Sequence, residues 1–176
     1  HDNTYTHDPQ NPPMDEVLRY AASHLDFYAA AYYTAQASAF KPGGHQFEHA
    51  GKQDIILEGW KSPERLEREW AEVQEATRAA NRPGEFVAFP GYEWQGDGAW
   101  GDHNVSFREE GGPLLRVDTL PELYAGLREI EALAIPHHIG YLTAHRAPRW
   151  EAWDGSLSPY AEIYSVHGCS ETDEEC

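Results

Sequence analysis

Four residues of the types that bind divalent metal ions stand beside predicted strands. Glu93, His137 and His167 each follow an apolar run, and His103 opens a short strand after a glycine-rich turn. Carboxylate and neutral imidazole together suit zinc, manganese or iron, and an ion held by them can activate water for attack on an ester or phosphate. A single histidine at a strand end is more often structural, but four such positions on successive elements indicate a metal site.

Apolar periodicity predicts the elements that must position these side chains. Helices are expected over 15–24, 62–81 and 119–131, and strands over 25–34, 85–91, 103–107, 132–136 and 161–166. Ser62 and Pro63 form the clearest helix start. The alternation of helices and strands predicts an α/β fold with mostly parallel strands and outer helices, in which function gathers at the carboxyl ends of the strands.

Further candidate ligands lie beside His137 and in a long loop. His138 adjoins His137, and since adjacent strand residues point to opposite faces, we expect only His137 to face the site. His45, Glu48 and His49 lie in a long stretch over 35–61 that could supply further ligands, although a solvated insertion is the preferred interpretation.

The bulk composition limits the class of partner. The formal net charge is −17, with 13 Lys and Arg against 30 Asp and Glu, so a nucleic-acid partner is not expected. No apolar run is long enough to predict a membrane span. No signal peptide is recognised, and the compartment and oligomeric state are left open. Both ends look truncated, which predicts a single incomplete domain over 1–176.

Four segments of the chain resemble a known superfamily. They are FVAFPGYEW over 86–94, GDHNVSF over 101–107, AIPH over 134–137 and AEIYSVHGCSE over 161–171. Together they resemble blocks of the polymerase and histidinol phosphatase (PHP) superfamily, closest to a branch named only as a domain of unknown function. The resemblance implies that Glu93, His103 and His137 are metal-site positions, whereas it assigns no role to His167.

The N-terminal motifs of the superfamily match less well. Its first motif is His-x-His before a Thr/Ser-rich turn, and His1 resembles the second histidine, with its partner upstream. In that case His7 or Asp8 is a further candidate; alternatively His1 is the first histidine and Asn3 takes the second position. The second motif normally ends in Asp-His, where this chain has Tyr32-Tyr33. Tyrosine is a poor substitute ligand, so one or two metals are expected rather than three.

The resemblance implies a partial, distorted (β/α) TIM-like barrel of PHP type. It implies a metal-dependent hydrolase of phosphoesterase type acting on a small-molecule, phosphorylated substrate with a metal-activated water. Glu93, His103 and His137 would be the catalytic residues, and these three with His1 would hold one or two divalent Zn, Mn or Fe ions. Two alternatives stay open: a catalytically degenerate metal-binding or scaffold domain, and a metal-dependent hydrolase of a non-phosphate substrate. The second is indicated by loop tryptophans, Trp94, Trp100, Trp150 and Trp153.

Overall fold

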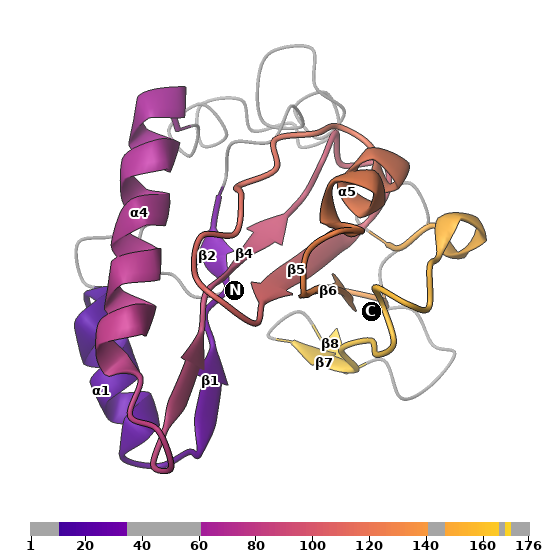
Figure 1. Ribbon diagram of the computed structural model, residues 1–176. Coiled ribbons are helices and arrows are strands. Elements are labelled where there is room, and N and C mark those ends of the chain that lie inside the picture. The colour runs from indigo at the N-terminus through magenta and orange to yellow at the C-terminus, as the bar shows by residue number, and fades with distance from the viewer. Residues whose placement is uncertain (1–10, 35–60, 141–146, 166–167, 170–176) are drawn as a thin grey trace.

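The computed structural model describes residues 11–34, 61–140, 147–165 and 168–169 (Figure 1). In chain order its elements are α1 (Met14–Ala22), β1 (Phe27–Ala29), β2 (Tyr32–Tyr33), α4 (Pro63–Ala80), β3 (Val87–Phe89), β4 (Gly91–Trp94), β5 (Asp102–Phe107), α5 (Leu120–Leu127), β6 (Ala132–His137), the 3-10 turn η2 (Trp150–Ala152), β7 (Tyr164–Ser165) and β8 (Gly168–Cys169). The three predicted helices are confirmed, although α5 ends earlier than expected.

The helix starts follow from local capping chemistry. Ser62 Oγ accepts the backbone N–H of Arg65 at 3.3 Å and caps α4. The carboxylate of Glu122 accepts the backbone N–H of Thr119 at 3.0 Å, which completes a capping box at the start of α5. Helices α1 and α4 lie side by side along β1 and β3, and α5 packs on β6 (Figure 1).

The predicted strand over 25–34 is divided in two. β1 pairs in parallel with β3, and β2 pairs in parallel with β4, and both ladders keep one constant register. Pro90 lies between β3 and β4, where one ladder ends and the other begins. It has no backbone N–H to donate to a ladder. The prediction that this strand is buried is wrong at Phe27, whose side chain is 63% exposed.

Gly91 lets the backbones approach closely after this break. A Cβ atom at Gly91 would lie 2.3 Å from the carbonyl oxygen of Ala30 and 2.6 Å from that of Val105. A side chain would therefore push apart the strands on both sides of β4.

The larger sheet is mixed, with the order β2-β4-β5-β6. β5 runs antiparallel to both β4 and β6. The expectation of mostly parallel strands is therefore wrong for β5, because residues 95–101 form too short a connection for a parallel crossover. The described strands form a mixed α/β structure and do not close into a barrel.

One face of the larger sheet carries the hydrophobic core. Tyr92 and Phe107 on this face contact Trp70 of α4, whose ring centroid lies 5.5 Å and 6.0 Å from theirs. The indole of Trp70 also donates to the carbonyl oxygen of Gly112 at 2.9 Å. These contacts hold α4 against one face of the sheet. The side chains on the opposite face therefore interact with other parts of the chain.

The predicted strand over 161–166 is replaced by a short antiparallel pair, β7 with β8. The preceding chain runs beside β6 instead: the N–H of Ala134 bonds to the carbonyl of Leu157 at 2.8 Å, and the N–H of Glu162 bonds to that of Pro136 at 3.0 Å. Within the predicted range the described strand is β7, and the side chains of Ile163 and Tyr164 are exposed.

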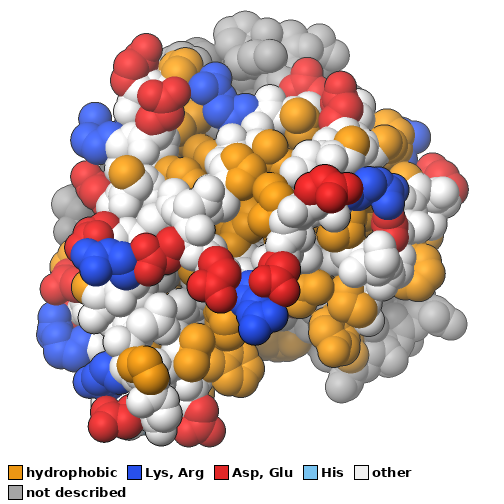
Figure 2. All heavy atoms as spheres, viewed as in Figure 1, with side chains coloured by type: hydrophobic (Ala, Val, Ile, Leu, Met, Phe, Trp, Pro, Cys, Tyr) orange, Lys and Arg blue, Asp and Glu red, His pale blue; other side chains and the backbone are white. Residues whose placement is uncertain are grey.

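The surface in Figure 2 carries Lys and Arg side chains among Asp and Glu side chains, without a continuous basic area on that face. Hydrophobic side chains gather near its centre. In the part of the chain that the structure describes, no helix combines the length and apolarity needed to cross a bilayer.

Candidate metal centre

The sheet register brings two predicted ligands to one face. Glu93 lies within β4 rather than after it, directly opposite Asn104 of β5. His137, the last residue of β6, lies opposite Asp102. Because directly paired residues share a face and alternate residues return to it, all four side chains project from the face opposite the hydrophobic core.

Glu93, His137 and His138 form the candidate metal centre. Each offers one ligand atom, and these atoms lie within 4.8 Å of one another. The three side chains are buried, with Glu93 showing no exposed surface. One carboxylate and two imidazoles are a donor set that zinc and related ions accept.

The expectation that His138 faces away from His137 is wrong. β6 ends at His137, and His138 has a φ of 57°, in the left-handed region. The alternation of an extended strand therefore stops between them, and their ring centroids lie only 3.5 Å apart. A non-glycine residue in this conformation is uncommon, and it is what adds a second imidazole to the group.

His103 is not brought into this group. It pairs with Trp94 and Pro136 and so lies on the core face, one residue out of phase with Glu93 and His137. Its ring makes edge contacts with Trp94 at 5.8 Å and with Tyr124 at 6.4 Å. Burial lowers the pKa of His103 to about 4, which keeps the ring neutral at physiological pH.

Three polar side chains that the sequence did not single out surround the centre. Gln95 donates its amide to Glu93 Oε1 at 3.0 Å. Glu162 lies 2.7 Å from His137 Nδ1 and also accepts the amide of Asn104. Asn104 stands in the GDHN motif and could have been found from it, whereas no local signal identifies Glu162.

A second buried carboxylate lies nearby. Asp102, at the start of β5, is fully buried, and its Oδ2 lies 3.9 Å from His138 Nε2. Asp102 is therefore a second buried acid beside the candidate metal centre.

Tyr32 and Tyr33 lie on different faces. Tyr32 pairs with Tyr92 on the core face, and its hydroxyl donates to Glu69 Oε2 at 2.7 Å. Tyr33 pairs with Glu93 and shares the face of the metal centre. Tyr32 is therefore part of the core. There Lys61 Nζ also lies 2.8 Å from Glu69 Oε2.

The remaining predicted ligands lie outside the described residues: His1, His7, Asp8, His45, Glu48, His49 and His167. Of the four tryptophans expected in loops, Trp94 lies in β4 and is buried, whereas Trp150 and Trp153 are about half exposed.

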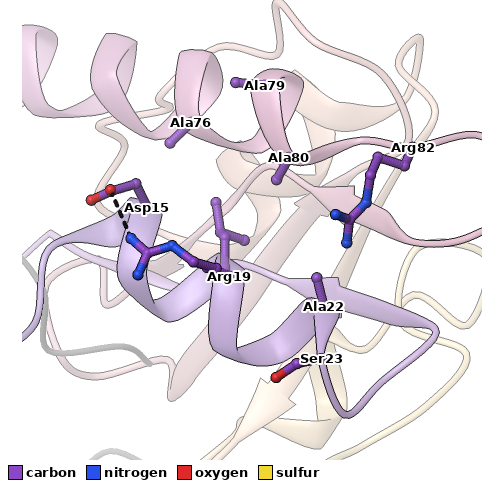
Figure 3. A pocket seen from close by; sticks show the side chains of 9 residues that line it. Asp15, Arg19, Ala22, Ser23, Ala76, Ala79, Ala80 and Arg82 are labelled. Carbon is purple, nitrogen blue, oxygen red and sulfur yellow. Dashed lines mark hydrogen bonds and ion pairs between the residues drawn. The ribbon is translucent and has the colours of Figure 1, made fainter.

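A separate groove of about 600 Å³ lies between α1 and α4 (Figure 3). Small side chains line it, including Ala22, Ala76 and Ala80, with Arg82 at its edge. Arg19 points along this groove but pairs with Asp15 at 3.2 Å. The residues that line the groove do not indicate a ligand, and the groove is distinct from the metal centre.

Fold and site together define a mixed α/β protein with a buried cluster of one carboxylate and two imidazoles. Residues 6–126 match the family model described as Protein of unknown function (DUF3604), and the chain belongs to that family. The matched region includes Glu93 and His103 and ends before His137. No curated protein and no solved structure matches the chain.

Proposed function

We propose that this protein is a metal-dependent hydrolase of phosphoesterase type, related to the PHP superfamily. The observation that carries the proposal is the convergence of Glu93, His137 and His138 from β4 and the end of β6 on one buried group. The finer description of the fold, a partial (β/α) TIM-like barrel, belongs to the same proposal.

The donor set fits a divalent cation. A buried carboxylate is costly unless a cation or hydrogen bonds compensate it, and Glu93 has no exposed surface. His137 and His138 would supply two neutral imidazole donors, which suit zinc, manganese or iron. One or two ions of this kind would supply Lewis acidity and activate water at neutral pH.

The residues of the chain provide orientation and exclude solvent. Gln95 fixes one oxygen of Glu93, and Glu162 fixes the ring of His137. Because these side chains are held by partners on the protein, the ligand atoms are organised before an ion arrives. The substrate of this proposal is a small phosphorylated molecule, which would bind on the face of the sheet that carries Glu93 and His137.

The alternative is a metal-binding domain without hydrolytic activity. The observation that favours it is the position of Tyr32, whose hydroxyl is engaged by Glu69 on the core face. This residue stands where the superfamily resemblance expects an acidic ligand. A hydrolase would then depend on fewer ligands than the superfamily pattern contains.

Metal analysis and a hydrolysis assay test the proposal. Protein supplemented with manganese or zinc should retain at least about one equivalent of metal and hydrolyse an aryl phosphate. Glu93→Gln should abolish both properties, whereas Glu131→Gln, at an exposed carboxylate paired with Arg108, should abolish neither. Metal retention without hydrolysis would favour the binding domain, and protein without metal would refute the proposal.

A further inference from the structure

The carboxylate of Glu162 joins two strands of the metal-centre face. Its Oε2 lies 2.7 Å from Nδ1 of His137, which is the last residue of β6. Its Oε1 accepts the side-chain amide of Asn104 on β5. One oxygen therefore contacts a candidate ligand, His137, and the other contacts Asn104, the cross-strand partner of Glu93. Glu162 is not itself a member of the ligand group.

This contact determines which nitrogen of His137 carries a proton. An ionised carboxylate can only accept hydrogen bonds, so Nδ1 must donate to Glu162. The neutral tautomer then has its lone pair on Nε2, the nitrogen that a metal ion would take. The same contact fixes the plane of the ring, since rotation of the imidazole would break a 2.7 Å bond.

The carboxylate also acts on the strand beside Glu93. Asn104 is the cross-strand partner of Glu93 and is largely buried. Its amide nitrogen donates to Glu162, whereas Asn104 Oδ1 has no hydrogen-bond partner among the described residues. Glu162 thus orients a buried amide, with its oxygen available as an acceptor, next to a candidate ligand.

The side chain of Glu162 is not what holds its own segment in place. The backbone of this segment bonds to β6 at Ala134 and Pro136. Ser158 adds a hydrogen bond from its hydroxyl to the carbonyl of Ala134. Because these contacts do not use the carboxylate, its removal should leave the segment attached.

We propose that Glu162 is a positioning residue of the metal centre, setting the tautomer and ring orientation of His137. The proposal rests on the proposed function as far as metal is concerned, but its effect on His137 does not require metal. Carboxylates that hold ligand histidines in this way typically contribute 10-fold to 100-fold to metal affinity.

The test compares E162Q with E131Q, a matched change of an exposed glutamate directly before β6. Zinc and manganese affinities are measured by titration calorimetry, and the His137 tautomer is read from nitrogen chemical shifts in metal-free protein, assigned by their loss in H137N. E162Q should bind metal about 10-fold to 100-fold more weakly and show mixed tautomers. E131Q should match the parent protein in both measurements, and thermal melts should show both variants folded.

Either of two results overturns the proposal. One is a His137 that keeps its Nδ1–H tautomer in E162Q, and the other is equal metal affinity for E162Q and E131Q. If the parent protein binds neither metal, the proposed function fails. The tautomer measurement then decides alone whether Glu162 positions His137.

Discussion

Glu93 and His103 stand on the neighbouring strands β4 and β5, near the same end of the sheet, but project from opposite faces. Trp94 pairs with His103, and Asn104 pairs with Glu93, so the two candidate ligands differ by one residue in phase. The sequence-based resemblance to the PHP superfamily predicts both residues in one metal site. In the structure Glu93 instead lies with His137 and His138, and the effect of this difference on metal binding can be measured.

Replacement of His138 should weaken metal binding more than replacement of His103. His138→Ala removes a member of the ligand group, so the dissociation constant should rise by more than about 100-fold, beyond the effect of an outer partner. His103→Gln should change the dissociation constant by less than about tenfold, because this residue affects the centre only through packing. Calorimetric titration with zinc checks both variants, and the reverse order would restore the assignment implied by the resemblance.

The stability of the protein should depend on His103 between about pH 6.5 and 4. Burial lowers the pKa of His103 from 6.5 to about 4, so the unfolded chain binds a proton in this range and the folded protein does not. The neutral ring favours the folded state above pH 6.5, and that contribution is lost as the pH falls toward 4.

Urea denaturation at several pH values measures this dependence in metal-free protein. Relative to His103→Gln, the parent protein should lose on the order of 3 kcal/mol across the range. Parallel pH profiles for the two proteins would show that His103 titrates normally in the folded state.

Glu69→Gln should destabilise the fold by about 3 kcal/mol, because it leaves the buried Lys61 ammonium without its carboxylate. The two groups lie 2.8 Å apart and both are buried. The exposed pair of Arg78 and Glu75 supplies the control, and Glu75→Gln should cost less than about 0.5 kcal/mol. Similar costs for the two variants would contradict this account.

The effect of Glu69 should also weaken in acid. Burial opposes its ionisation, but the hydrogen bonds donated by Lys61, Tyr32 and Arg65 outweigh burial and lower its pKa below the usual 4.5. A lowered carboxyl pKa stabilises the folded state above the unfolded value, and this stabilisation is lost as the pH falls through the folded value. The difference between parent protein and Glu69→Gln should therefore narrow below pH 4.5, which denaturation curves can follow.

Gly91→Ala should be more damaging than Gly84→Ala. At Gly91 a Cβ would collide with two backbone carbonyls, whereas at Gly84 it meets open space and the cost comes only from a φ of 83°. We expect a loss of about 3 kcal/mol or more for Gly91→Ala and about 1 kcal/mol for Gly84→Ala. Thermal melts check the order, and equal losses would show that β4 can move away from its neighbours.

Helices and individual strands follow well from the sequence, because their determinants are local. Ser62 and the Thr119 capping box mark two helix starts, and apolar runs mark β3 and β6. The direction of β5 could have been inferred from its short connection to β4. The break at Pro90 is also visible in the sequence, although the strands it separates keep one register.

Taken alone, the sequence identified Glu93 and His137 as candidate ligands, since residue type and position at a strand are encoded locally. Only the tertiary structure decided which neighbours join them. His103 lies on the opposite face because it is one residue out of phase with the candidate ligands. His138 joins the ligand group because its backbone is left-handed. Glu162 contacts His137 although 25 residues of chain separate them. Strand register and backbone turns depend on pairing between distant segments, and therefore no local pattern could specify them.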